Sequence, residues 1–326
     1  MSDDGKRSLF LLLPPFVYAV ILMAIPVGAV VLISLTAEDG GLTLSNYRDV
    51  FTDPINVIGV VRGAAEAPEG FPGEFLWGVW TRITGLFDGT WTTGLLLRSL
   101  FVSILVTMAT VIFAFPIAYF ISFHVQPSRK SLWLFLITIP FWTSYLIRIF
   151  LWKVILGFSG PLNWLYLEFA NSPLGPLFGI EAGTAEPLDL MFNVSAVVVT
   201  LAHAYAPFAI LPIFVALEKI DRSLLEASQD LGETKYTTFI RVTLPLAVPG
   251  IVAAVLIVFI PTIGDYVTPE LVGGPGGLLI SNRIQGLFLQ VNQPEIGSAL
   301  SIVTMAAVAM VSLIFVFLNR RWLKGR

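Results

Sequence analysis

The sequence predicts an all-α membrane protein with six transmembrane helices. Hydrophobic residues make up 56% of the chain and charged residues only 13%, about half the charged share of an average soluble domain. The mean hydropathy is +0.83, and the apolar residues gather in runs of the roughly 20 residues that a helix needs to cross a bilayer. Because a backbone in lipid has to satisfy its own polar groups, such runs form helices. They are too long and too continuous for the alternating strands of a membrane barrel.

The first predicted span covers residues 9–35 and follows Lys6 and Arg7. It is much longer than the apolar part of a signal peptide, about 7–15 residues, and it lacks a small-residue cleavage site. We therefore expect residues 1–35 to be a short tail and a retained first helix.

Residues 36–96 contain no apolar run of span length and are rich in Gly, Pro, Trp and acidic residues. This composition predicts an external loop or small subdomain with short interfacial helices. The remaining chain, 97–326, is predicted to be a five-helix core, with spans at 97–123, 132–156, 194–217, 246–267 and 298–319.

Lysine and arginine set the predicted orientation, because they are enriched in cytoplasmic segments. Most of the chain's 19 lysines and arginines lie in four short stretches. Six spans with both termini in the cytoplasm place all four stretches on that side; they are 1–8, 124–131, 218–245 and 320–326.

Several classes of function are excluded by what the sequence lacks. There is no cysteine for thiol or iron–sulfur chemistry, and only two histidines are present. Neither a HExxH metal motif nor a phosphate-binding GxxxxGK[ST] loop occurs, so we expect no bound cofactor and no catalysis by this chain. The net charge of −3 gives no basis for a nucleic-acid partner.

The polar block 218–245 carries the strongest local pattern. Ser223 and Glu226 have the spacing of a capping box, Leu224 and Leu231 lie at helical spacing, and Gly232 suits the residue that ends a helix. With Thr234 as a second cap, the block predicts a helix, a glycine bend and another helix. On pattern alone, this element is either a docking surface for a partner or an amphipathic helix lying on the membrane.

The same block resembles the EAA loop of binding-protein-dependent ABC permeases. That motif reads Glu-Ala-Ala, three residues, Gly, nine residues, Ile, any residue and Leu-Pro. The chain departs from it at Ser228, in place of the third residue, and at Val242, in place of Ile; the matching residues are Glu226, Ala227, Gly232, Leu244 and Pro245. The resemblance implies that the loop, Ser228 included, couples the permease to an ATPase subunit.

The resemblance continues from 97 to the C-terminus and is closest to spermidine/putrescine permeases around 263–274, Ile-Gly-Asp-Tyr-Val-Thr-Pro-Glu-Leu-Val-Gly-Gly. It implies a type I ABC importer permease of a bacterial or archaeal cytoplasmic membrane. Residues 50–95 have no counterpart in the resemblance, which implies that the external loop 36–96 contains an insertion. The implied partners are a sister permease (we favour a different chain), two ATPase copies that bind ATP and Mg, and a periplasmic or lipid-anchored solute-binding protein. A polyamine is the expected cargo; opines, other amines and organic acids are alternatives.

Charged side chains within spans are candidates for a substrate path because they are costly in lipid. Asp265 ends the fifth span, so it either faces the path, caps the helix or pairs with Arg148. Carboxylates and aromatic rings suit an organic cation, and we therefore add to the candidate path Tyr266, Glu270, Trp142, Tyr145 and Trp152. For these aromatic residues, anchoring at the membrane interface is the alternative.

Two other classes of function fit the sequence less well. An ion-driven secondary transporter is expected to show internal repeats with interrupted helices. A membrane-embedded enzyme needs clustered histidines or carboxylates within its spans. The sequence shows neither pattern, so both predictions rank below the importer permease.

Overall fold

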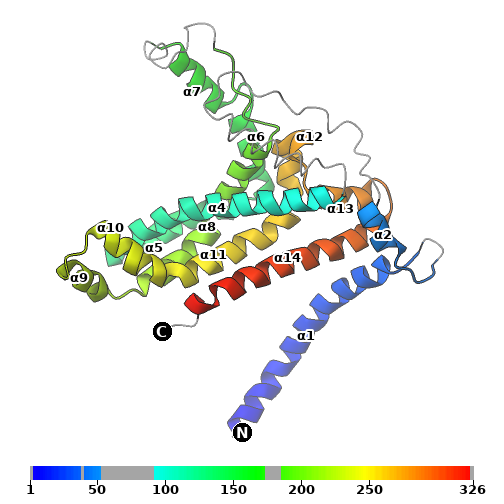
Figure 1. Cartoon of the computed structure of the whole chain (residues 1–326), viewed down its shortest axis with the longest axis horizontal. Coiled ribbons are helices and arrows are strands. Elements are labelled where there is room, and N and C mark those ends of the chain that lie inside the picture. The colour runs from blue at the N-terminus through cyan, green and yellow to red at the C-terminus, as the bar shows by residue number, and fades with distance from the viewer. Residues whose placement is uncertain (1–2, 38–39, 53–91, 173–184, 324–326) are drawn as a thin grey trace.

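The computed structural model describes residues 3–37, 40–52, 92–172 and 185–323, and Figure 1 shows them as a bundle of helices without a β-sheet. The long helices α4, α8, α11 and α14 run side by side along the longest axis of the molecule. The helices are α1 (Asp3–Ser34), α2 (Ser45–Thr52), α4 (Thr92–His124), α5 (Pro127–Thr138), α6 (Tyr145–Leu156), α7 (Pro161–Ala170), α8 (Val194–Glu218), α9 (Arg222–Asp230), α10 (Lys235–Thr238), α11 (Leu244–Gly264), α12 (Gly274–Gly277), α13 (Ile280–Leu289) and α14 (Pro294–Leu323).

Six helical stretches among the described residues are long and apolar enough to cross a membrane, which confirms the predicted number of spans. Five of them coincide with predicted spans to within about four residues, except that the first begins at Val17 rather than at 9 and the fifth at Lys235 rather than at 246. The six stretches are Val17–Ser34, Gly94–His124, Tyr145–Ala170, Val194–Glu218, Lys235–Gly264 and Pro294–Trp322.

The third span is where the prediction is wrong in detail, because no continuous helix covers 132–156. Helix α5 passes into the 3-10 turn η1 (Ile139–Trp142), and the chain is extended at Thr143 before α6 begins. Pro140 lies in the turn; a proline has no N–H to donate and its ring crowds the preceding turn. The carbonyl oxygen of Pro140 instead accepts from the Thr143 hydroxyl at 2.7 Å and from Nη2 of Arg148 at 2.9 Å. The stretch in this region that is long and apolar enough to cross a membrane is instead Tyr145–Ala170, which comprises α6 and α7.

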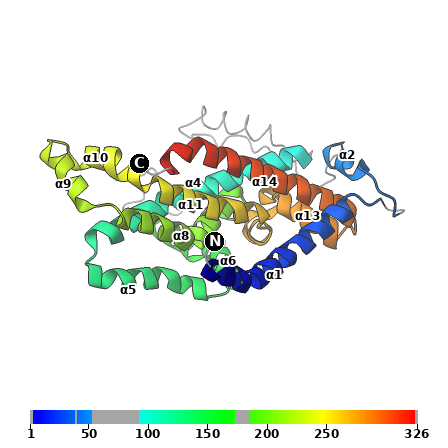
Figure 2. The ribbon, with the colours of Figure 1, turned by 90° about the horizontal axis from the view of Figure 1, so that it is seen from below.

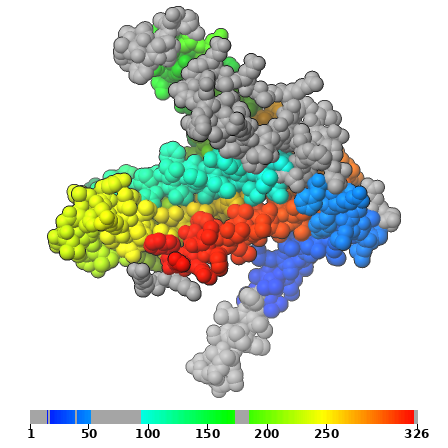
Figure 3. All heavy atoms as spheres, in the orientation of Figure 1, coloured from blue at the N-terminus to red at the C-terminus, as the bar shows by residue number. Residues whose placement is uncertain are grey.

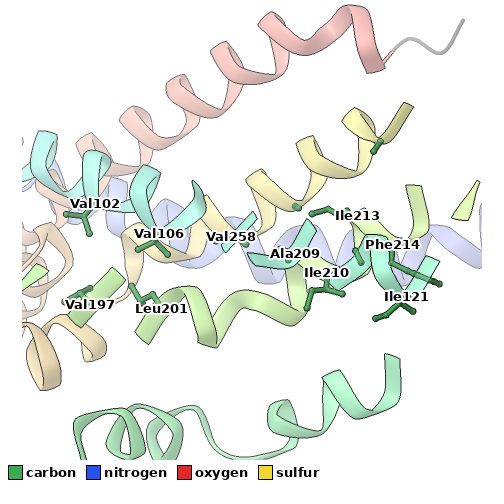
Figure 4. Packing of buried hydrophobic residues seen from close by; sticks show 14 of the residues in the cluster. Val102, Val106, Ile121, Val197, Leu201, Ala209, Ile210, Ile213, Phe214 and Val258 are labelled. Atoms are coloured by element: carbon green, nitrogen blue, oxygen red, sulfur yellow. The ribbon is translucent and has the colours of Figure 1, made fainter. Parts of the chain in front are cut away.

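Helix α8 lies at the centre of the bundle. Half of its residues are buried, the largest share among the six stretches. The buried cluster in Figure 4 joins α4, α8 and α11 through residues such as Val106, Leu201 and Val258. Helices in lipid associate through close packing rather than through expulsion of water. The stability of this cluster therefore depends on how closely the side chains of the three helices fit together.

Gly250 of α11 shows how close that packing is. A Cβ added there would lie 2.5 Å from the Pro212 carbonyl oxygen and 2.5 Å from the Ala216 Cβ of α8. Real Cβ atoms do not approach backbone this closely, so any side chain at 250 has to move the two helices apart. Small residues of this kind let helix backbones approach in membranes.

We predict that Gly250→Ala lowers the stability of the folded chain by about 1–3 kcal/mol, the usual cost of overpacking. The measurement is the temperature at which the detergent-solubilised protein loses its monodisperse size-exclusion peak. Gly28→Ala is the matched control, because a Cβ at Gly28 of α1 meets nothing within 4 Å. Equal melting of the two variants would show that the α8–α11 contact is not tight.

Helix α1 diverges from the rest of the bundle (Figure 1). Only 6% of its span is buried, against 33% for α4, and it contacts mainly α14. Side chains such as Met23 and Tyr18 are exposed. Between Val17 and Ile33 this helix therefore presents an apolar surface.

The predicted external segment 36–96 is described only in part. Helix α2 follows α1 closely, and the amide of Asn46 donates to the carbonyl oxygens of Ser34 and Thr36 at 3.0 and 2.8 Å. Residues 53–91, the greater part of the segment, lie outside the described residues, so its assignment as an insertion stays a prediction.

Candidate functional site

The polar block between α8 and α11 starts its first helix differently from the prediction. The predicted capping box at Ser223 and Glu226 is wrong: α9 begins at Arg222, and its N-cap is Asp221, whose carboxylate accepts from the Ser223 backbone N–H at 3.0 Å. This hydrogen bond, together with one from the Ser223 side chain, lowers the pKa of Asp221. A carboxylate is a strong N-cap acceptor, so it takes the place that the pattern assigned to serine.

The glycine bend is as predicted. Gly232 has a φ of +90°, the conformation for which glycine is favoured. Its N–H donates to the Gln229 carbonyl at 2.9 Å, and the Glu233 N–H donates to the Ser228 carbonyl at 3.2 Å. This pair of bonds is a Schellman motif. Thr234 then caps α10 by accepting from the Thr237 N–H at 3.2 Å.

Two further contacts hold the two arms of the bend in one arrangement. The hydroxyls of Ser228 and Thr238 lie 3.1 Å apart, and Arg241 forms a 2.5 Å ion pair with Glu233. The element that results from these contacts has a defined angle, as a docking element requires.

The bent element forms an exposed lobe at one end of the molecule (Figure 3). None of the residues of α9 is buried. Leu224 is 49% exposed and Leu231 is 87% exposed, and the predicted coupling residues Glu226, Ala227 and Gly232 are exposed beside them. Ser228 is half-buried in the bend, whereas Leu244 and Pro245 lie at the start of α11 and do not belong to this surface.

A pocket of about 390 Å³ lies where α6, α8 and the end of α11 meet. Aromatic rings, one carboxylate and one guanidinium line it. The lining residues are Phe141, Thr143, Tyr145, Arg148, Ala204, Tyr205, Phe208, Pro261, Gly264 and Asp265.

Asp265 both lines this pocket and caps the chain that follows α11. Its Oδ1 accepts from the backbone N–H groups of Val267 and Thr268 at 3.0 and 3.4 Å. Its Oδ2 accepts from the Tyr145 hydroxyl at 2.5 Å. Asp265 as a whole is only 9% exposed. The capping alternative is confirmed; Asp265 also lines the pocket, and its place on a substrate path stays a prediction.

The third alternative, an ion pair between Asp265 and Arg148, is wrong. Among the described residues, ion pairs join only Lys130 to Glu218 and Arg241 to Glu233. The Arg148 guanidinium instead donates to the carbonyl oxygens of Pro140, Thr143 and Ala204 at 2.9, 3.3 and 3.3 Å. It also lies 4.8 Å from the centre of the Phe141 ring, so carbonyl oxygens and a ring face surround its charge.

The other predicted path residues are not brought together. Only Tyr145 joins Asp265 in the pocket. Tyr266, Glu270 and Trp142 are exposed outside it, with Trp142 80% exposed. Trp152 donates from Nε1 to Nδ1 of His203 at 3.0 Å, away from the pocket lining.

Three aromatic residues of the pocket were not predicted from sequence: Phe141, Tyr205 and Phe208. Tyr205 and Phe208 lie within a continuous apolar run, where an aromatic residue gives no sign of facing a pocket rather than lipid. Phe141 follows Pro140. A helix break at this proline is the one local signal from which a pocket residue at 141 could have been predicted.

Comparison with known proteins places the chain in a transport context. Residues 75–324 match the family model described as binding-protein-dependent transport system inner membrane component. The chain is 36% identical over 220 residues to the spermidine/putrescine transport system permease protein PotB of Escherichia coli strain K12, covering 68% of this chain and 75% of that protein. It is 31% identical over 216 residues to the inner membrane ABC transporter permease protein YdcU of the same strain, covering 66% of this chain and 68% of that one.

Solved structures show the same fold at lower identity. A chain of a bacterial ABC transporter involved in the import of the acidic polysaccharide alginate superposes with a TM-score of 0.60 and 17% identity. The match covers 98% of this chain and 97% of that chain. At this identity the likeness concerns the fold alone.

Proposed function

The chain belongs to the family of binding-protein-dependent transport system inner membrane components and is an ABC importer permease; from this we propose that it imports a polyamine by an ATP-driven mechanism. The cargo would be delivered by a periplasmic or lipid-anchored binding protein. The chain itself carries out no covalent chemistry, and ATP with Mg binds to a separate ATPase partner.

The observation that carries the cargo assignment is the Asp265 carboxylate in an aromatic pocket. A buried carboxylate attracts an ammonium group, and aromatic faces such as those of Tyr205 and Phe208 add cation–π attraction when water is excluded. The 36% identity to a spermidine/putrescine permease supports the same cargo class. A polyamine offers ammonium groups together with apolar methylene segments, which suit these two kinds of lining.

One observation favours a second cargo class. Arg148 lines the same pocket as Asp265 without pairing with it. A pocket with both charges also suits a solute that carries an amine and an acid, such as an opine, or an organic acid. The two classes predict opposite responses to loss of the Asp265 charge.

The exposed α9 surface is proposed to dock into the ATPase partner. Leu224 and Leu231 supply apolar contact area beside Glu226 and Ala227, and the Gly232 bend defines the angle of the element. Leu244 and Pro245 begin α11, through which movement of the element reaches the pocket. Binding of ATP and of the loaded binding protein would shift a two-state equilibrium between inward-open and outward-open forms.

The remaining surfaces suit the other partners. We propose that α1, which is little buried in this chain, packs against a different sister permease, and that membrane lipid covers the other exposed apolar faces. The segments predicted to be cytoplasmic around 124–131 and 218–245 and the C-terminal end of α14 lie towards the same end of the bundle (Figures 1 and 2). This arrangement supports a cytoplasmic location for these three parts, with the binding protein at the opposite end, and we propose a cytoplasmic N-terminus from the charge pattern alone.

The test uses the whole transporter, purified through a tag on this chain and reconstituted in vesicles with its cognate binding protein. We expect putrescine or spermidine to stimulate ATP hydrolysis about tenfold or more, as expected when a ligand shifts a two-state equilibrium by about 1.4 kcal/mol. Octopine and succinate serve as comparison solutes. Stimulation by either of these alone would contradict the polyamine assignment.

The same vesicles distinguish an importer from an ion-driven transporter. Uptake of labelled putrescine should require ATP on the ATPase side and should persist after an ionophore collapses the proton and sodium gradients. Uptake that stops with the ionophore and continues without ATP would contradict the ATP-driven mechanism.

A further inference from the structure

A cluster of charged and polar side chains, here the Lys130–Glu218 cluster, joins four elements at the base of the exposed lobe. Nζ of Lys130 lies 2.7 and 2.8 Å from the two carboxylate oxygens of Glu218. The Ser122 hydroxyl donates to the same carboxylate at 3.1 Å, and Nη2 of Arg222 donates to the Ser122 carbonyl oxygen at 3.4 Å. These four residues belong to α5, α8, α4 and α9.

The pair between Lys130 and Glu218 differs from the other ion pair in the described part of the chain. Arg241 and Glu233 lie eight positions apart in the same polar block, and the Arg241 side chain is 69% exposed; exposed pairs of this kind contribute little to stability. Lys130 is only 8% exposed, and its partner lies 88 positions away in the sequence. A buried ammonium is costly unless it is paired, so the carboxylate holds α5 to the end of α8.

Helix α9 has two connections to the bundle. Its C-terminal end continues through α10 and the π-helix η3 (Phe239–Thr243) into α11. Its N-terminal end is joined through three residues to Glu218, the last residue of α8, and Arg222 itself contacts the cluster. Displacement of α9 is therefore transmitted to α11 at one end and to the cluster at the other.

Helix α5 connects the cluster to the pocket. It lies at the edge of the molecule (Figure 2), and apolar side chains such as Leu132 and Phe135 are exposed along it. The turn after α5 places Phe141 and Thr143 in the pocket lining. Arg148 holds this turn by its bonds to the Pro140 and Thr143 carbonyl oxygens.

The helix is thus attached at both ends; between them it is mostly exposed, and Leu134 and Ile137 pack against the buried cluster. Lys130 attaches its N-terminal part to Glu218 beside α9, and Arg148 attaches the turn at the other end to the pocket. A helix is stiff along its axis, so movement at one end is carried to the other.

We propose that the Lys130–Glu218 pair makes α5 move together with α9, so that displacement of the docking element moves the pocket wall at Phe141 and Thr143. Lys130 and Glu218 are then positioning residues for transport, acting through α5 rather than touching the cargo. This inference rests on the proposed function, in which α9 docks into an ATPase.

The test compares two double variants in the reconstituted transporter. Lys130→Met with Glu218→Gln removes both charges and leaves no buried charge unpaired. Lys130→Glu with Glu218→Lys reverses the pair and keeps the attraction. We expect the neutral double variant to assemble and hydrolyse ATP, but to take up roughly tenfold less putrescine per ATP, within the usual range of coupling between sites.

The reversed pair should recover most of the uptake per ATP, because α5 is again attached to α8. Arg129→Met is the matched control: Arg129 is the exposed neighbour of Lys130 on α5, and its loss should leave the ratio unchanged. Measuring uptake and hydrolysis on the same vesicles separates loss of coupling from loss of protein.

Three results would overturn the inference. The first is wild-type uptake per ATP in the neutral double variant. The second is failure of that variant to assemble, which would show that the pair serves stability alone. The third is a reversed pair that takes up no more putrescine per ATP than the neutral variant. Failure of the proposed function is recognised separately, because the wild-type complex itself would then show no ATP-driven uptake.

Discussion

Gly232→Val is expected to abolish uptake while leaving the chain inserted in the membrane. Gly232 has a φ of +90°, and a Cβ at this position meets nothing within 4 Å. The substitution therefore causes no collision; its cost is backbone strain of about 1–3 kcal/mol. The chain can relieve this strain by giving up the Schellman bend, since α9 buries no residue that would hold it in place.

A changed bend redirects the whole docking element. Since α9 and α10 meet at Gly232, a change in this one conformation moves Leu224 and Glu226 relative to the bundle. We expect cargo-stimulated ATP hydrolysis in the reconstituted complex to fall at least about tenfold, a change of about 1.4 kcal/mol in the coupled equilibrium.

Two control variants test whether the loss of uptake comes from the positive φ that residue 232 must adopt. Gly232→Asn should retain partial activity, because asparagine adopts positive φ more readily than other non-glycine residues. Gly276→Ala adds a Cβ that also meets nothing within 4 Å, without a positive φ, and should behave as wild type. Normal uptake by the valine variant would contradict the coupling role of the bend.

Asp265→Asn is expected to have the second large effect, on recognition of the cargo. Asparagine keeps the shape of the side chain, and its oxygen can still accept from the Val267 and Thr268 N–H groups. The substitution removes the negative charge from the pocket and with it the attraction to an ammonium group. Losing one partner of a buried charge pair costs about 2–5 kcal/mol, so polyamine-stimulated ATP hydrolysis should fall more than tenfold.

Tyr145→Phe is the matched variant for this experiment. It removes the 2.5 Å hydrogen bond to Asp265 but keeps the charge, and it leaves one carboxylate oxygen free for an ammonium group. We expect polyamine stimulation to be retained or to reach its midpoint at lower polyamine concentration. Unchanged stimulation in Asp265→Asn would show that the carboxylate only caps the chain after α11. Stimulation by an acidic solute that rises in this variant would favour the second cargo class.

Short sequence patterns predicted those structural elements whose defining residues lie within a few positions of one another in the chain. The Gly232 bend is an example, since the Schellman bonds run between Ser228 and Glu233. The N-cap of α9 shows the limit of the same approach: Asp221 and Ser223 are both good caps, and the local pattern does not show which of them acts. The break in the third span was missed because its hydropathy is continuous through Pro140.

The candidate pocket could be predicted only in part. Asp265 and Tyr145 were identified because charge and aromatic character within spans are unusual. Tyr205 and Phe208 were not, because an apolar span does not show which of its faces is turned to a pocket. The same limit applies to Trp142, which had the right chemistry and is exposed outside the pocket.

The sequence by itself determined six apolar spans, their polar connections and the bent element at 218–245, because bilayer thickness and short-range hydrogen bonding act on contiguous residues. Only the tertiary structure decided that Tyr145 meets Asp265 and that Lys130 meets Glu218. These contacts join residues 120 and 88 positions apart, and they depend on how the helices pack. In lipid that packing follows from shape and from small residues such as Gly250 rather than from hydropathy, which is similar on every face of these helices.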